Sequence, residues 1–294
     1  MKPTYTAHII KTPDNATLTY FRWRQGTLPR PAVVLLHGLG SNYTRWLEFI
    51  EKSALSHHYD IFVPDLRGHG DSVTSGIISM EKWTQDLAQI LRQENYHDAV
   101  IIGHSLGAHL AHFFAHRYPK YVRGLVLIDP LSHQDFTPSI RLLWRLRALA
   151  YLLLFILLIL NRLGIKRRSL PRRNLRLLDT QARQLIAQGR YAEMIKLYSS
   201  VWTDLKYNPT ANYLQYTLQV LRPLPQIKNN PVPVLLLLSS GSSYNTGKAH
   251  NGFGEQFSRC TQKVVHCNHW LLTEKPDEAC QFIVQWFDQV FPQD

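Results

Sequence analysis

One short stretch in the middle of the chain constrains the fold more than any other part of the sequence. The apolar residues Val100–Ile102 are followed by Gly-His-Ser-Leu-Gly at positions 103–107, and a helix-compatible segment begins directly afterwards. A strand, a tight turn and a helix in this order would hold Ser105 in a strained backbone conformation, with no room for side chains at Gly103 and Gly107. The turn would also lift the serine hydroxyl clear of the sheet, as in a nucleophile elbow.

Strands and helices alternate on both sides of this stretch. Residues 6–24 read as an antiparallel hairpin, because two alternating segments are split by a Pro-Asp-Asn turn. The apolar runs that follow are continuous, as expected for strands covered on both faces by helices. The expected strands are 32–36, 60–65, 100–102, 123–129, 234–238 and 262–266, and the expected helices are 46–55, 80–93, 108–117 and 278–291. This order predicts an α/β fold with a doubly wound, mostly parallel sheet.

The alternation is interrupted by a long helical segment. It stops after Pro130 and resumes at Pro233. We therefore expect a core of residues 1–130 and 231–294 and an inserted helical domain of residues 131–230. The insertion begins at the carboxyl end of the strand that follows Ser105, so it is placed to form a cap over the serine.

The net charge of +12 is concentrated in this insertion. Residues 131–230 contain 16 Lys and Arg against 4 Asp and Glu, and the rest of the chain is balanced. The insertion is therefore expected to face an anionic partner, or at least to tolerate one nearby. Three cysteines near the end of the chain are too few for a disulfide framework, and the N-terminus lacks the apolar core of a signal peptide. These features favour a cytoplasmic protein.

Four motifs, taken in order, resemble the α/β-hydrolase superfamily. They are His37-Gly38, the stretch Asp65–Ser72, the elbow Gly103–Gly107, and His269-Trp270 with Glu274-Lys275-Pro276 downstream. The resemblance covers residues 15–130 and 231–291 and implies an α/β-hydrolase fold. It leaves the reaction open, because this fold hosts many chemistries.

The resemblance implies roles for individual residues. Ser105 would be the nucleophile and His269, which follows the last core strand, its general base. His266 competes for the second role, but it lies in an apolar run and is expected to belong to the strand. The backbone N–H groups of Leu39 and Leu106 would form the oxyanion hole. No cofactor and no metal is expected.

The sequence departs from the family pattern at the triad acid. Most relatives carry an aspartate after the strand that follows the cap, whereas here Leu238 is followed by Ser-Ser-Gly-Ser-Ser-Tyr-Asn-Thr. Asp129, at the end of the strand after the elbow, is the best substitute and keeps the chain order serine, acid, histidine. Two alternatives stay open: Asp129 caps a turn beside a Ser–His dyad, or the site is inactive.

The insertion contains an uncharged, apolar segment that indicates what kind of substrate or surface it contacts. Residues 148–160 carry no charge and would form a helix about 20 Å long, too short to cross a hydrocarbon core of about 30 Å. Basic residues flank it on both sides between positions 141 and 176. Such a helix could lie on an anionic membrane surface, or it could be buried between cap and core. Nucleic-acid binding is not expected, because no aromatic residues are interleaved with the basic ones.

Other candidate residues are expected to be structural. His109, His112 and His116 share a helix face at metal-compatible spacing, but no thiolate or carboxylate accompanies them, so a solvated face is expected. Asp65 and Asp71 are expected to stabilise their loop. The sequence thus predicts a serine hydrolase of a hydrophobic ester, such as a monoacylglycerol or lysophospholipid. A C–C hydrolase or lactonase, and a non-catalytic membrane-associated binding protein, are the alternatives.

Overall fold

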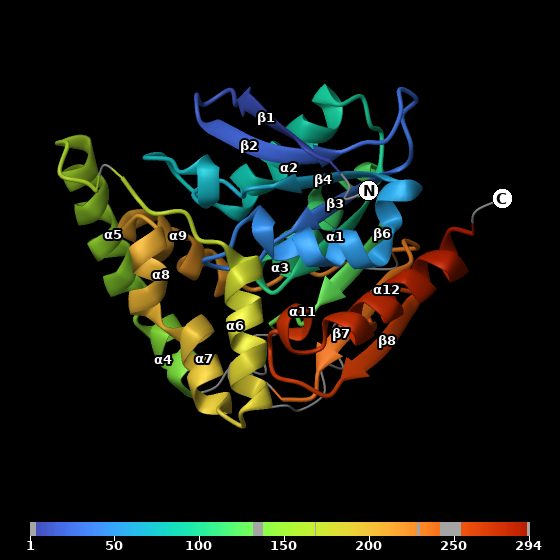
Figure 1. Cartoon of the computed structure of the whole chain (residues 1–294). Coiled ribbons are helices and arrows are strands. Elements are labelled where there is room, and N and C mark those ends of the chain that lie inside the picture. Colours follow the sequence, from blue (N-terminus) through green and yellow to red (C-terminus); the bar gives the residue numbers. More distant parts are fainter. Residues whose placement is uncertain (1–3, 132–137, 168, 228–229, 242–253, 293–294) are drawn as a thin grey trace.

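The computed structural model describes residues 4–131, 138–167, 169–227, 230–241 and 254–292 (Figure 1). Within them, eight strands form one sheet in the order β1-β2-β4-β3-β5-β6-β7-β8. The strands are β1 Thr6–Lys11, β2 Thr17–Trp23, β3 Ala32–Leu36, β4 Asp60–Pro64, β5 Ala99–His104, β6 Val122–Ile128, β7 Val234–Ser239 and β8 Cys260–Val265. The expected hairpin pairs β1 with β2, and β2 is also antiparallel to β4, whereas the pairs from β4 to β8 are parallel.

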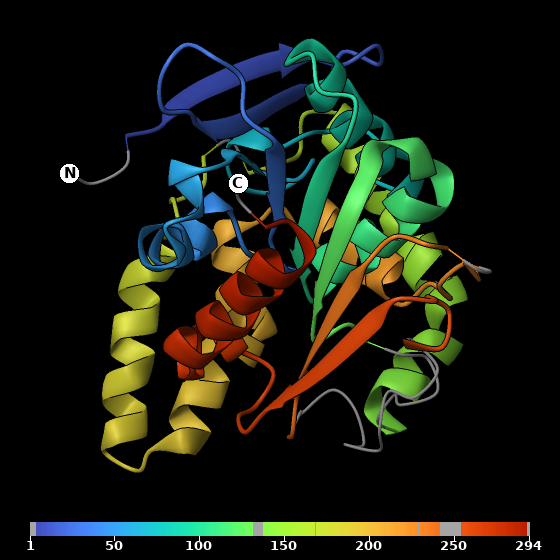
Figure 2. The ribbon, with the colours of Figure 1, turned by 90° about the vertical axis from the view of Figure 1, so that its right-hand side faces the viewer.

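Helices cover both faces of the sheet. The helices α1 (Leu47–Ser53) and α12 (Pro276–Val290) pack on one face, and α2 (Met80–Gln93) and α3 (Leu106–Arg117) pack on the other. Figure 2 shows α1 and α12 together on one side of the strands. Successive side chains of a strand alternate between the two layers: Val33 contributes to the first, and Val34 to the second. This double burial explains why the central strands are apolar at every position.

The segment between β6 and β7 is helical wherever it is described. Its helices are α4 Pro138–Arg145, α5 Arg147–Arg162, α6 Leu175–Ala187, α7 Tyr191–Ser199, α8 Val201–Tyr207 and α9 Thr210–Val220. They gather on one side of the sheet, with α5 at the outer edge of the molecule (Figure 1). We call residues 138–220 the helical insertion. Among the described residues, no helix combines the length and the apolar character that crossing a bilayer requires.

The expected boundaries of the core strands and helices agree with the structure within two residues, and two of the small differences have identifiable reasons. The helix expected over 46–55 ends at Ser53, because Ala54 adopts a left-handed conformation with φ of 53°, and a separate 3-10 turn, Leu55–His57, follows. The last strand ends at Val265. His266 was expected inside that strand, but it lies one residue beyond it with an exposed side chain.

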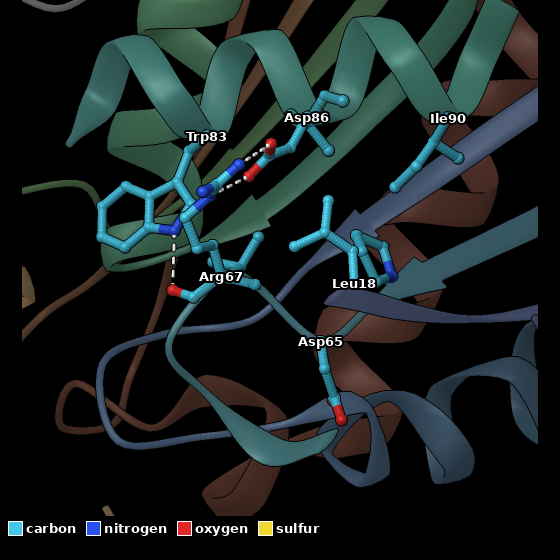
Figure 3. A pocket seen from close by; sticks show the side chains of 9 residues that line it. Leu18, Asp65, Arg67, Trp83, Asp86 and Ile90 are labelled. Carbon is cyan, nitrogen blue, oxygen red and sulfur yellow. Dashed lines mark hydrogen bonds and ion pairs between the residues drawn. The ribbon is translucent and has the colours of Figure 1, made fainter. Parts of the chain in front are cut away.

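The loop of Asp65–Ser72 is held by the buried side chain of Arg67 (Figure 3). The Arg67 guanidinium donates to both carboxylate oxygens of Asp86, at 2.8 and 2.7 Å, and also binds Asp14. The indole N–H of Trp83 donates to the Arg67 carbonyl at 3.0 Å. The cavity beside these side chains measures about 10 Å³, enough for about one water molecule. This part of the family motif therefore supports the fold and offers no substrate pocket.

Candidate active site

The turn between β5 and α3 has the strained geometry that its sequence predicts. Ser105 adopts φ of 54° and ψ of −115°, a conformation that non-glycine residues rarely occupy. A Cβ added at Gly103 would lie 2.2 Å from the Gly107 carbonyl oxygen, and one added at Gly107 would lie 2.1 Å from that of Leu36. Backbone from both sides thus approaches the turn too closely for any side chain at positions 103 and 107.

We expect Gly107→Ala to destabilise the fold by about 3 kcal/mol, because the clash is with backbone of the central strand β3 and cannot be relieved by a rotamer change. Chemical denaturation followed by circular dichroism measures this loss. Gly76→Ala is the matched control, since the nearest atom to its added Cβ is the side-chain oxygen of Thr74 at 3.3 Å. A Gly107→Ala protein as stable as the Gly76→Ala control would contradict the close approach described above.

Three side chains from different parts of the chain meet beside this turn. His269 Nε2 lies 2.9 Å from Ser105 Oγ, and His269 Nδ1 lies 2.5 Å from Asp129 Oδ2. Ser105 leaves the end of β5, Asp129 directly follows β6, and His269 lies in the loop after β8. All three side chains are buried. Of the arrangements left open by the sequence, the structure shows the one in which the Asp129 carboxylate contacts the imidazole.

Asp129 is oriented by a residue that sequence reasoning passed over. Its second carboxylate oxygen, Oδ1, accepts hydrogen bonds from the backbone N–H and the hydroxyl of Ser239, both at 2.9 Å. Ser239 ends β7, at the position where the family pattern places its usual acid. In the sequence, Ser239 is the first residue of the serine-rich run after Leu238, and this run indicates only that a carboxylate is missing there. Residues 242–246 of the run lie outside the described residues.

The electrostatics of the group fix the proton positions. Burial alone would raise the pKa of Asp129, but the hydrogen bonds from His269 and Ser239 outweigh it and lower that pKa below its usual value. An ionised Asp129 can only accept, so His269 Nδ1 carries the proton and donates it to Oδ2. In the neutral form of this tautomer, the lone pair on Nε2 faces Ser105 Oγ at 2.9 Å and can accept its proton.

Two neutral histidines border the group. His104 precedes the serine, and its Nε2 lies 3.0 Å from the His269 carbonyl oxygen. Burial, together with the neighbouring His269, lowers the pKa of His104 to about 3. Burial lowers the pKa of His37 to about 4, and its ring bridges the Gly38 carbonyl and the Leu66 N–H. Neither adds positive charge beside the imidazole at neutral pH.

The expected oxyanion-hole residues lie on both sides of Ser105. Leu106 is the first residue of α3, where helix N–H groups have no acceptor within the helix. On the other side, a Cβ added at Gly38 would lie 3.5 Å from Ser105 Cβ, so the turn that leads into Leu39 passes directly beside the serine. The placement is compatible with the predicted pair of backbone donors, which stays a prediction.

The helical insertion is fastened to the loops that carry these residues. Arg45, in the loop region after β3, binds Asp179 of α6 at 2.5 Å, and Thr273 Oγ1 donates to the same carboxylate at 2.8 Å. Trp270, the neighbour of His269, packs against Ala182 and Met194 of α6 and α7. The insertion therefore contacts the residue next to the imidazole.

A second buried ion pair of the insertion reaches the turn after β3. Arg173 binds Asp204 at 2.6 Å and also donates to the Gly40 carbonyl at 3.2 Å. The Asn42 amide returns a hydrogen bond to the Arg173 carbonyl at 2.7 Å. The insertion thus forms hydrogen bonds with the turn that contains the expected oxyanion donor Leu39.

The comparisons with known proteins agree with this architecture. A model of the alpha/beta hydrolase fold family matches residues 31–276. The chain belongs to this family. Its alpha/beta hydrolase relatives include the sn-1-specific diacylglycerol lipase ABHD11 of Mus musculus, 25% identical over 86% of this chain and 80% of its own length. A putative esterase/lipase of Haemophilus influenzae is 24% identical over 97% of this chain and 93% of its own length. The solved structure of a thermophilic esterase from Thermogutta terrifontis superimposes with a TM-score of 0.70 and 20% identity, covering 97% of this chain and 99% of that one.

The resemblance and the fold class predicted from the sequence are thereby confirmed, including the mostly parallel sheet and the inserted helices. This alpha/beta hydrolase has relatives with esterase and lipase names. At these identities the names support a hydrolase of that kind and do not transfer a substrate.

The structure corrects one expectation about the histidines of α3. The face of His109, His112 and His116 was expected to be solvated, but the first two side chains are buried and only His116 is exposed. His109 Nε2 lies 2.6 Å from the Leu131 carbonyl oxygen, and His112 Nε2 lies 3.2 Å from Gln256 Oε1. The expectation failed because α3 packs between the sheet and later segments of the chain. No group of three metal-ligating side chains is found within the described residues.

Asp65 has the structural role that was expected of it. Its carboxylate accepts the backbone N–H groups of Tyr43 and Asp71, each at 2.8 Å. Burial raises the pKa of Asp65 to about 7 despite these hydrogen bonds. Asp71 forms an ion pair with Arg172 of the insertion at 3.1 Å.

Proposed function

We propose that this alpha/beta hydrolase is a serine carboxylester hydrolase with a Ser105–His269–Asp129 triad. The observation that supports the proposal is the continuous chain of contacts from Asp129 through His269 to Ser105, in the proton arrangement that general-base catalysis needs. The non-catalytic alternative rested on the missing carboxylate after Leu238, and Asp129 supplies a carboxylate at the imidazole instead.

The proposed reaction has two halves. Ser105 Oγ attacks the ester carbonyl while its proton moves to His269 Nε2, and the N–H groups of Leu39 and Leu106 stabilise the oxyanion. The carbon–oxygen bond to the alcohol breaks, the alcohol leaves with the proton from His269, and an acyl-enzyme remains. Water then attacks this ester with His269 again as base, which releases the acid and regenerates Ser105. Asp129 stays ionised throughout and stabilises the imidazolium.

The helical insertion would act as a cap over the site, as part of a proposed domain of residues 131–230. Its contacts with Trp270, the neighbour of His269, and with the Gly40 carbonyl support this role. An apolar lining supplied by these helices would favour a substrate with a hydrophobic acyl or alkyl part, such as a monoacylglycerol or lysophospholipid.

A panel of matched substrates tests the reaction type. The proposal predicts hydrolysis of p-nitrophenyl esters, with kcat/KM rising from acetate to octanoate. Enol lactones and vinylogous β-diketones of similar size should react at least 100-fold more slowly. Turnover of the lactone or the diketone at the higher rate would instead make the protein a lactonase or a C–C hydrolase.

Ser239 supplies a further prediction for this mechanism. We expect Ser239→Ala to lower kcat about tenfold, because it removes one of two hydrogen bonds that orient an ionised carboxylate. The same loss should raise the pKa of Asp129 and move the pH of acid unfolding upward, because the carboxylate then protonates at a higher pH. Ser239→Thr keeps the hydroxyl and should restore both quantities. An alanine variant with an unchanged rate and an unchanged pH of acid unfolding would show that Ser239 does not position Asp129.

A further inference from the structure

Helix α5 presents an apolar surface to the solvent. One stripe of the helix, Ala150, Leu154, Leu157 and Leu158, packs against Ala211, Leu214 and Leu218 of α9. The opposite face consists of Leu149, Leu152, Phe155, Ile156, Ile159 and Leu163, which we call the α5 outer face. All six side chains are exposed, and Leu163 reaches 71%. A helix of a water-soluble protein normally turns polar residues outward, and contiguous exposed apolar surface usually marks an interaction site.

The α5 outer face lies between two groups of cations. Arg141, Arg145 and Arg147 precede it, and Arg162, Lys166 and Arg167 follow it; all six are exposed, and we call them the basic rim. The sequence contains no Asp or Glu between positions 136 and 178, so the charged side chains of this segment are all basic. The Arg147 guanidinium stacks over the Trp144 ring at 3.8 Å, which adds an aromatic residue of the type found at membrane interfaces.

Three other basic residues of the insertion differ from the basic rim in their partners. Arg172, Arg173 and Arg176 were grouped with them in the sequence, but each forms an ion pair with an acidic residue: Asp71, Asp204 and Glu51, respectively. These three ion pairs help to hold the insertion in place. Within the basic rim, Lys166 donates to Ser75 Oγ at 3.0 Å and Arg167 donates to the Lys206 carbonyl at 2.9 Å, and both of these partners are uncharged. Figure 1 shows α5 at the outer edge of the molecule.

We propose that the α5 outer face and the basic rim dock this protein on the surface of an anionic lipid bilayer. The 16 residues of α5 span about 24 Å, too short for a hydrocarbon core of about 30 Å, so the helix lies in the interface and does not cross it. Its apolar side chains enter the acyl region, and the rim binds lipid phosphates. A second copy of the chain fits less well, because a two-fold contact would bring two basic rims together.

Docking of this kind does not depend on the proposed ester hydrolysis. It needs no working nucleophile, so Ser105→Ala binds vesicles as tightly as the unchanged protein. Conversely, variants of the α5 outer face keep full turnover of a soluble short-chain nitrophenyl ester. The two proposals therefore fail separately.

The test is sedimentation of the full chain with sucrose-loaded vesicles of phosphatidylcholine, with and without 30% phosphatidylglycerol. We expect Leu152→Glu/Ile156→Glu to lower the partition coefficient on anionic vesicles about 100-fold, since each change removes a membrane-buried side chain. Ile9→Glu/Leu28→Glu is the matched control, because both side chains are exposed apolar residues outside the insertion. This control binds like the unchanged protein.

The charge is tested in the same way. The variant Arg141→Gln/Arg145→Gln/Arg147→Gln removes three rim cations. We expect it to lower the partition coefficient on anionic vesicles about 100-fold, which is roughly fivefold for each cation. The control variant Arg92→Gln/Arg117→Gln/Lys120→Gln removes three cations outside the insertion and should change this coefficient little. Equal binding of both triple variants would contradict the proposal, as would equal binding to neutral and anionic vesicles. A dimer in analytical ultracentrifugation that Leu152→Glu/Ile156→Glu dissociates, with no vesicle binding, would overturn it in favour of contact between two copies.

Discussion

Replacing Ser105 with alanine is expected to lower kcat for p-nitrophenyl butyrate by about 10⁵, leaving only the rate that binding and the oxyanion donors provide. The loss is large because the hydroxyl is the group that forms the acyl-enzyme, and its oxygen lies 2.9 Å from His269 Nε2. The measurement is steady-state hydrolysis followed by nitrophenolate absorbance.

The control for this change is Ser56→Ala. Ser56 is also a buried serine, but it lies in the 3-10 turn after α1 and contributes nothing to the proposed mechanism. It should keep kcat within about twofold. If Ser105→Ala lost no more activity than Ser56→Ala, the hydrolysis would come from another site.

Replacing Asp129 with asparagine should lower kcat by about 10⁴, which corresponds to about 5.5 kcal/mol of transition-state stabilisation. An amide at this position can donate to His269 Nδ1, which would move the imidazole proton to Nε2 and leave no lone pair for the serine proton. The variant also loses the negative charge that stabilises the imidazolium. The backbone should tolerate the change, because Asn accepts the positive φ of 44° found at position 129.

Asp65→Asn is the matched control for that prediction. Asp65 is equally buried, but its carboxylate accepts backbone N–H groups and does not contact His269. Its replacement should lower stability and leave kcat nearly unchanged. A rate for Asp129→Asn within tenfold of the Asp65→Asn rate would favour a Ser–His dyad, with Asp129 confined to holding the turn.

The sequence predicts those parts of the site that depend on local backbone geometry. The spacing of Gly103, Ser105 and Gly107 predicts the nucleophile elbow, because a strained turn between strand and helix leaves no room for side chains two residues before and two residues after the serine. The strands are recognisable because burial on both faces makes them apolar throughout. Asp129 could be named as a candidate because it ends a strand whose carboxyl end must lie beside that of β5.

What the sequence does not encode locally is the identity of a distant partner. In the sequence, Ser239 stands where the family pattern has a carboxylate. The pairing of β6 with β7 brings it beside Asp129, to which its N–H and its hydroxyl both donate. Arg173 belongs to a basic run in the sequence, yet its partner Asp204 lies 31 residues away in α8. His109 and His112 read as one polar helix face, whereas tertiary packing buries both. Each of these contacts depends on the packing of whole elements.

The central claim, that Ser105 is a nucleophile activated by His269, is tested most directly by covalent labelling. The folded protein is incubated with a fluorophosphonate probe, digested, and the modified peptide is sequenced by mass spectrometry. We expect one adduct per chain, on Ser105, with labelling that His269→Ala abolishes. A folded protein that hydrolyses esters yet shows no adduct on Ser105, or an adduct on another residue, would contradict the mechanism.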